Sequence, residues 1–208
     1  MSVELDHILW AAPDLDKGSA LIGMLTGVMP GRGGSHPGFG TRNSLLSLGE
    51  SYLEVISPDP AQSLEGNRGG QIAALSDPGL MTFSVRTTDI GAYEAAAKRL
   101  GVGTKGPIAM GRTRPDGVRL AWSSLYITDP VYGESIPFAI DWKDSPHPAA
   151  SAPAGCRLLS FAVLHPEATK LTRIYREMGI SVDVKAAPKP GFLAVLGTPR
   201  GEVVLGSH

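Results

Sequence analysis

The chain has 208 residues, of which 42% are hydrophobic and 19% charged, an ordinary globular balance that can bury a sizeable core. The formal net charge is −1 and the basic residues are scattered, which argues against a nucleic-acid partner. No apolar run approaches the length of about 20 residues that a membrane helix needs, which argues against a membrane partner. The acidic first residues and a single cysteine, Cys156, favour a cytoplasmic protein whose thiol packs in the core.

The first part of the chain predicts a strand, a helix and two further strands. The apolar run VELDHILWAAP is typical of a strand, and the Asp-rich junction at residues 14–16 can cap a helix over residues 16–25. The segment GRGGSHPGFGTRNSLL follows and is interpreted as a glycine-rich loop leading into a strand. In the next run, SYLEVISP, strand alternation places Tyr52, Glu54 and Ile56 on one face.

The same plan returns twice. GLMTFSVRT predicts a strand, AYEAAAKRL a helix ending at Gly101, and residues 105–112, 118–128 and 136–142 further strands. CRLLSFAVL then predicts a strand before a helix that runs to about Met178 and three closing strands. The chain's 26 glycines and 17 prolines fit such short elements.

This order predicts an α+β fold of repeated βαβββ modules, which form cupped, mostly antiparallel sheets with helices on the outside. The Pro-, Ala- and Ser-rich stretch DSPHPAASAPAG is typical of a linker. We therefore expect paired modules over residues 1–143 (about 1–60 and 79–143), a linker over 144–155 and a third unit over 156–208.

His7 and Glu54 are the candidate metal ligands. A histidine in an apolar strand is more often a core residue than a ligand, so His7 alone is ambiguous. Glu54 lies in the otherwise apolar run YLEVISP, where a half-buried carboxylate needs a partner, a metal or a raised pKa, unless the strand is an exposed edge. A histidine nitrogen and a carboxylate oxygen together are a normal start for a divalent transition-metal site.

The glycine-rich segment and two nearby strands supply candidate substrate-binding residues. The segment lacks both P-loop and dinucleotide-binding spacing, so it does not predict a nucleotide site. It does present His36, Arg42 and Asn43, and Arg42 is suited to a carboxylate or enolate oxygen, the alternative being a structural turn with a surface ion pair. Tyr52 and Arg86 complete the set, with core packing and a solvated strand end as their alternatives.

The runs LDHILWAAPDLD and HPGFGTRNSLLSLGESYLEVISPDP resemble the glyoxalase-like family of the vicinal oxygen chelate superfamily, most clearly over residues 4–60. The resemblance implies paired βαβββ modules around a U-shaped cavity, where a divalent ion binds two oxygens of a substrate or its intermediate. It implies that His7 is the first-strand ligand and that Glu54 is the last-strand carboxylate, with a catalytic role as well. The second module departs from the pattern, because Thr82 falls opposite His7; Asp141 in PFAIDWKD stands in as the third ligand if it points inward.

Two functions follow from this resemblance. The first is a metal-dependent isomerase, lyase or ring-cleaving dioxygenase that acts on a small oxygen-bearing substrate with Fe, Mn, Zn or Ni; the dioxygenase ranks lower because it prefers two histidines and one carboxylate. The alternative is a metal-free protein that binds or sequesters small molecules. A cup of two modules does not account for the third unit, which can pack on the first pair or pair with its copy from another chain. Either arrangement would cover an open sheet edge, and we expect the homodimer.

Overall fold

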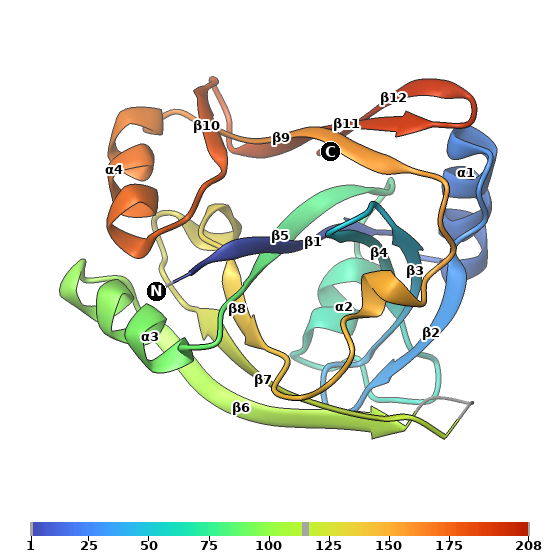
Figure 1. Cartoon of the computed structure of the whole chain (residues 1–208), viewed down its shortest axis with the longest axis horizontal. Helices are drawn as coiled ribbons and strands as arrows, with labels where there is room; N and C mark the ends of the chain where they lie inside the picture. The colour runs from blue at the N-terminus through green and yellow to red at the C-terminus, as the bar shows by residue number, and fades with distance from the viewer. Residues whose placement is uncertain (1, 114–116, 208) are drawn as a thin grey trace. The chain divides into compact units, whose positions relative to one another are not determined.

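The structure is a computed structural model that describes residues 2–113 and 117–207 (Figure 1). The elements, in chain order, are β1 (Glu4–Ala11), α1 (Leu15–Thr26), β2 (Gly31–His36), β3 (Thr41–Ser47), β4 (Tyr52–Pro58), α2 (Arg68–Ala73), β5 (Gly79–Arg86), α3 (Ile90–Arg99), β6 (Thr104–Thr113), β7 (Arg119–Ile127), η1 (Gly133–Ser135), β8 (Phe138–Asp141), η2 (Pro148–Ala150), β9 (Arg157–His165), α4 (Ala168–Met178), β10 (Asp183–Ala186), β11 (Gly191–Thr198) and β12 (Gly201–Gly206). The βαβββ order thus occurs three times, and the α+β class is confirmed.

The chain divides into two compact units, each built from segments that are distant in sequence. Unit 1 holds the N-terminal segment up to His7 together with Thr82–His147 and Phe161–Phe192. Unit 2 holds Ile8–Met81, Pro148–Ser160 and the segment from Leu193 onward. The division into modules along the chain therefore stays a prediction. Among the helices that the structure describes, none has the length and apolar character needed to cross a membrane.

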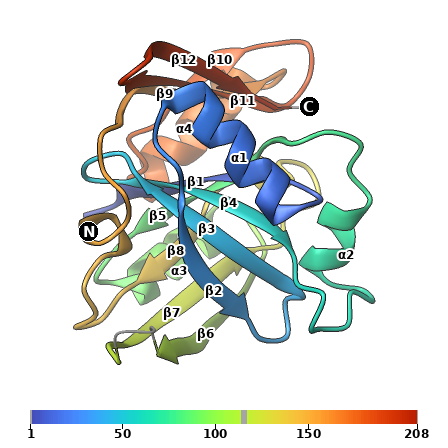
Figure 2. The same ribbon diagram turned by 90° about the vertical axis from the view of Figure 1, so that its right-hand side faces the viewer.

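In unit 2, strands β2, β3 and β4 form an antiparallel ladder with α1 packed against β3 and β4 (Figure 2). The helix is capped as the sequence predicts, since Asp14 Oδ1 accepts the backbone N–H of Lys17 at 3.0 Å. Gly18 of α1 lies close to Ala12, because a Cβ atom on Gly18 would be 2.6 Å from the Ala12 side chain. Ser19 on the helix also donates to Ser44 Oγ on β3 at 3.1 Å. This packing fixes the strands that carry Asn43 and Glu54.

The glycine-rich segment differs from its prediction. We expected a loop, but Gly31–His36 forms strand β2, paired with β3 through an irregular register between Arg32 and Ser35. Glycines have no side chains to alternate, so this strand left no sequence pattern. The short helix α2 was not predicted either.

In unit 1, β5 pairs in parallel with β8, and β8, β7 and β6 follow as antiparallel neighbours. The core is aromatic: the ring of Phe83 contacts those of Phe161 and Phe192, at centroid distances of 5.1 and 6.0 Å. Tyr93 of α3 is fully buried and donates its hydroxyl to Pro137 O at 2.9 Å. Apolar burial of these rings supplies the main stabilisation of the unit.

The Pro- and Ala-rich stretch predicted as a linker is partly packed. It contains the short helix η2, in which Pro148 and Ala149 are buried. The carbonyl of Pro153 accepts the backbone N–H of Ser47, at the end of β3, at 2.9 Å. Composition alone does not distinguish such a packed connecting segment from a flexible linker.

Candidate functional site

Three polar side chains meet on neighbouring strands of unit 2: His36 from β2, Asn43 from β3 and Glu54 from β4. Strand pairing sets Leu45 opposite Glu54 and Ile56 opposite Asn43, so Asn43 and Glu54 share one face of the ladder. Asn43 Nδ2 donates to Glu54 Oε1 at 2.5 Å and lies 3.2 Å from His36 Nε2. We call these three residues the Glu54 cluster.

Hydrogen bonding fixes the orientation of each group in the Glu54 cluster. Asn43 Oδ1 accepts the backbone N–H of Gly34 at 2.8 Å, so the amide presents its two N–H groups to Glu54 and His36. His36 Nε2 must then accept, which assigns the imidazole proton to Nδ1, and Nδ1 lies 2.9 Å from Thr41 Oγ1. The cluster therefore sets a neutral imidazole beside a hydrogen-bonded carboxylate.

Glu54 is only 5% exposed, and a carboxylate at this depth needs hydrogen-bond donors to offset the loss of water. His36 Nε2 lies 3.7 Å from Glu54 Oε1. A buried carboxylate beside a neutral imidazole can ligate a metal ion or exchange a proton with a bound molecule.

A second cluster, in unit 1, gathers around Asp6, which is fully buried. Its Oδ1 accepts from His7 Nδ1 at 2.5 Å, and its Oδ2 accepts from Trp142 Nε1 at 2.7 Å and lies 3.0 Å from His147 Nε2. Burial on its own would raise the pKa of Asp6. The hydrogen bonds from His147 and His7, and the positive charge that each ring carries when protonated, outweigh burial, so the pKa of Asp6 lies well below its usual range. We call these four residues the Asp6 cluster.

The Asp6 cluster defines the chemistry of His7. Because Asp6 Oδ1 is an acceptor, the proton of neutral His7 is assigned to Nδ1, and Nε2 is then the basic nitrogen. The His7 ring contacts Phe138 edge-on, at a centroid distance of 5.6 Å, which restricts its rotation. A carboxylate behind the far nitrogen of an imidazole is the usual support of a metal-bound histidine.

The sequence patterns assigned no role to Asp6, Trp142 or His147. Strand alternation places Asp6 on the face opposite to His7, and the two other donors lie 136 and 141 residues further along the chain. The signal that was available was an aspartate inside an apolar run, since a buried carboxylate requires donors.

A family model described as a glyoxalase-like domain matches residues 5–179. The chain belongs to this glyoxalase-like family. The resemblance that the strand motifs carry is thereby confirmed, and with it the membership of the vicinal oxygen chelate superfamily. No curated protein matches the chain.

Solved structures share the glyoxalase-like fold at low identity. A hypothetical protein from Staphylococcus aureus superposes with a TM-score of 0.66 at 19% identity, over 99% of this chain and 85% of that one. A methylmalonyl-CoA epimerase variant from Streptomyces coelicolor, in complex with 2-nitronate-propionyl-CoA, gives a TM-score of 0.50 at 17% identity, over 70% of this chain and 98% of that one. At these identities the likeness concerns the fold alone.

Two of the predicted substrate-binding residues of this glyoxalase-like chain lie apart from the Glu54 cluster. Arg42 pairs with Ser57 and so projects from the face of β3 opposite to Asn43. Its Nε is buried without a hydrogen-bond partner among the residues described. Arg86 donates to Glu4 Oε2 from Nε at 3.0 Å and from Nη2 at 2.6 Å, so an acid of the chain already pairs with it.

Tyr52 lies where alternation predicts, on the Glu54 face of β4, opposite Ser47, and is 4% exposed. His36 and Asn43, predicted as substrate-binding residues, lie beside Glu54. The structure thus brings three predicted site residues together, with Asn43 donating a hydrogen bond to the carboxylate of Glu54.

Asp141, the predicted third ligand, faces away from the His7 contact. Phe138 contacts His7, and alternation along β8 puts Asp141 on the other face. Asp141 Oδ2 pairs with Lys143 Nζ at 2.5 Å. Burial would raise the pKa of Asp141, but the side-chain and backbone hydrogen bonds from Lys143 outweigh burial, so the pKa lies below its usual value.

Thr82, at the expected position of the second histidine, donates to Glu134 O at 3.3 Å. Across residues 2–113 and 117–207, three or more His, Cys, Asp and Glu side chains nowhere gather in a metal-binding arrangement.

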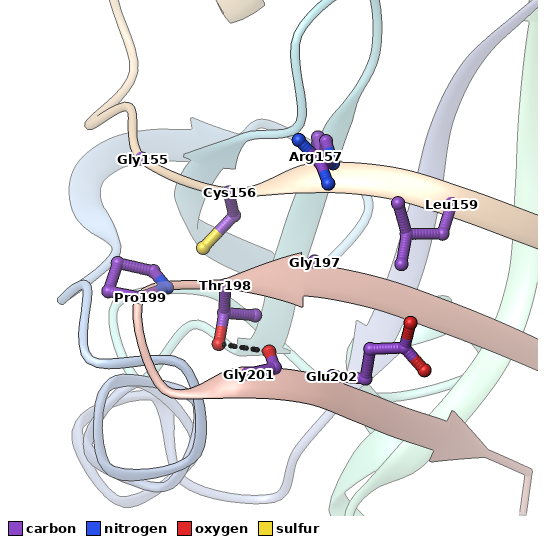
Figure 3. A pocket seen from close by; sticks show the side chains of 9 residues that line it. All are labelled: Gly155, Cys156, Arg157, Leu159, Gly197, Thr198, Pro199, Gly201 and Glu202. Carbon is purple, nitrogen blue, oxygen red and sulfur yellow. Dashed lines mark hydrogen bonds between the residues drawn. The ribbon is translucent and has the colours of Figure 1, made fainter.

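Unit 2 also carries an open groove of about 440 Å³ that shares no residue with the Glu54 cluster (Figure 3). Its lining comprises Gly155, Cys156, Arg157, Leu159, Gly197, Thr198, Pro199, Gly201 and Glu202. Cys156 is a free, buried thiol, and burial raises its pKa, which suits the packing role expected from the sequence better than a nucleophilic one.

Proposed function

We propose that this glyoxalase-like protein is a metal-dependent enzyme that acts on a small oxygen-bearing organic molecule, with His7 and Glu54 as metal ligands. Family membership supports the class of protein, and the ligand assignment rests on the resemblance of the two strands. The observation that carries the proposal is the hydrogen bond from His7 Nδ1 to the buried Asp6 carboxylate. It leaves Nε2 as the basic nitrogen of the imidazole, the form in which histidine binds metals.

The donor chemistry fits a divalent transition metal. A neutral imidazole and a carboxylate oxygen suit Fe, Mn, Zn and Ni alike, and a bound ion would polarise an oxygen of the substrate as a Lewis acid. Asn43 holds Glu54 Oε1, which orients the carboxylate, while the neutral His36 beside it is suited to accept a proton. We assign Glu54 the catalytic role, and proton-transfer reactions of the isomerase or lyase type suit these residues best.

A metal-free binding protein is the second candidate, and two contacts favour it. Thr82 donates to a backbone carbonyl at the place of the expected second histidine, and Asp141 is paired with Lys143. The family that the chain resembles includes both kinds of protein. The two candidate functions differ in whether the protein holds a metal ion and in whether it turns over a substrate.

Elemental analysis of protein purified without chelator separates the two candidates. We expect a stoichiometric divalent metal in the wild type and its loss in both His7→Gln and Glu54→Gln, with circular dichroism to verify folding. Glu65→Gln, which changes an exposed carboxylate, is the matched control and should keep the metal. Retention of the metal in either test variant would remove that residue from the ligand set. A metal-free wild type that binds small organic anions would favour the second candidate.

A further inference from the structure

One face of the ladder formed by β6, β7 and β8 in unit 1 carries a row of aromatic side chains. In the pairing of β7 with β8, Ser124 lies opposite Ile140. Alternation from this pair places Trp122 and Tyr126 of β7 on the same face as Phe138 of β8. The aromatic face is defined here by six side chains from the three strands and the residue after β8: Met110, Trp122, Tyr126, Phe138, Ile140 and Trp142.

The rings of the aromatic face are held against one another in two pairs. Tyr126 stacks on Phe138, with a centroid distance of 5.5 Å and an angle of 21° between the rings. Trp122 contacts Trp142 at a centroid distance of 5.5 Å, with the rings tilted by 42°. The hydroxyl of Tyr126 also donates to Met110 Sδ at 3.6 Å. These contacts restrict ring rotation, so the six side chains form a defined surface.

This surface is not closed off from solvent. Tyr126, Phe138, Trp142 and Met110 are each partly exposed, whereas Phe83 in the core of the same unit is fully buried. Large aromatic side chains release most free energy when their whole surface leaves water. Three neighbouring rings and a thioether that stay half-buried therefore leave an apolar surface that a bound molecule can cover.

The Asp6 cluster joins the aromatic face to the proposed metal ligand. Asp6 Oδ1 accepts from His7 Nδ1 at 2.5 Å, and Asp6 Oδ2 accepts from Trp142 Nε1 at 2.7 Å. The His7 ring also meets Phe138 edge-on at a centroid distance of 5.6 Å. One buried carboxylate thus orients both the imidazole and an indole of the aromatic face. Such preorganisation suits a small, rigid molecule that contacts both.

We propose that the small oxygen-bearing molecule on which this protein acts is an aromatic compound, whose ring packs on the aromatic face while its oxygen substituents lie at His7. This inference rests on the proposed function and names its substrate class. Aromatic side chains attract a planar ring by stacked and edge-on contacts that a saturated ring of the same size does not make. The thioether of Met110 adds a favourable contact with such a ring. Because none of the six side chains carries a formal charge, the ring itself should be uncharged.

Mandelate and hexahydromandelate test the aromatic face. Both acids carry a hydroxyl and a carboxylate on neighbouring carbons, and they differ only in whether the six-membered ring is aromatic or saturated. Isothermal titration calorimetry should give a dissociation constant for mandelate that is about two- to tenfold lower than that for hexahydromandelate, the range expected for aromatic pair contacts. Tyr126→Leu and Phe138→Leu should each bring the ratio of the two constants close to one.

Two further variants control for general effects of substitution. Tyr126→Phe keeps the ring and should keep the preference for mandelate. Tyr132→Leu removes a partly exposed tyrosine ring that contacts His165 instead of the aromatic face, and it should leave both dissociation constants unchanged. Circular dichroism and elemental analysis of every variant verify that the fold and the metal content match those of the wild type.

The same titrations separate this inference from the metal proposal. Equal dissociation constants for the two acids in the wild type, or no binding of mandelate at millimolar concentration, would overturn the aromatic assignment even where the metal depends on His7 and Glu54. A preference that survives in both leucine variants would also overturn it, since the ring would then bind elsewhere. A metal-free wild type that still prefers mandelate, and loses the preference in both leucine variants, would refute the metal proposal and support the aromatic face.

Discussion

Asp6 Oδ1 lies 2.5 Å from His7 Nδ1, although adjacent residues of a strand normally point to opposite faces. The same carboxylate also accepts from Trp142 Nε1 at 2.7 Å. The buried charge is therefore balanced by donors that come from beyond β8. This arrangement makes the carboxylate of Asp6 a positioning group for His7.

Asp6→Asn should separate the positioning role of Asp6 from simple burial. The amide nitrogen that replaces one carboxylate oxygen would face a donor, so the free energy of unfolding should fall by about 2 kcal/mol. If His7 ligates a metal, the affinity for it should drop by about 10- to 100-fold, because the supporting carboxylate is lost. Urea unfolding and metal titration measure the two effects. Asp16→Asn, at an exposed aspartate of α1, is the control and should change neither.

Asp6 also predicts how stability depends on acidity. Its pKa in the folded protein lies well below the ordinary aspartate value near 3.9. A depressed folded pKa adds stability that is complete above the unfolded value and is lost as the pH falls toward the folded value. The free energy of unfolding of the wild type should therefore decline below about pH 4, and Asp6→Asn should decline less steeply there. Equal slopes in urea unfolding from neutral to acid pH would contradict the assignment of this charge to Asp6.

Periodicity predicted the elements well and the site only in part. Helix α1 and its caps follow from Asp14, Gly27 and an amphipathic run, all of which act within one turn of the helix. Strand β4 follows from alternation, and its register confirms that Tyr52 and Glu54 share a face. These features are local, so single-sequence patterns carry them.

The missed features depend on contacts between distant residues. Arg42 and Asn43 are adjacent and both polar, and no sequence pattern decides which of the two shares a face with Glu54. One residue of register reverses the answer, as it does for Asp141 in β8. Strand β2 was missed because its glycines present no alternation, although Gly33 there is what allows Asn43 to approach.

The ion pair between Glu4 and Arg86 offers a test of how much a partly exposed pair stabilises the fold. A double-mutant cycle with Glu4→Gln and Arg86→Met should give a coupling of about 0.2–1 kcal/mol, because both side chains are partly exposed and solvent screens them. The coupling should shrink with added salt. Urea unfolding measures it, and the pair Arg173 and Glu177 on α4, both exposed, provides a reference cycle. A coupling well above this range would mean that the pair is buried from water more than its exposure indicates.

Gly33→Ala tests the Glu54 cluster without touching its polar groups. A Cβ atom on Gly33 would lie 1.9 Å from Asn43 Oδ1, so the alanine should displace the amide and remove the donor of Glu54 Oε1. We expect a loss of about 1–3 kcal/mol in the free energy of unfolding, since the buried carboxylate of Glu54 would lose the hydrogen bond from Asn43. Gly91→Ala is the matched control, because the new Cβ would meet only Asp89 Oδ1 at 3.7 Å, and a helical alanine should stabilise α3 slightly. If Gly33→Ala unfolds like the wild type and its Asn43 side-chain amide resonances do not move, then Asn43 does not hold Glu54 in solution.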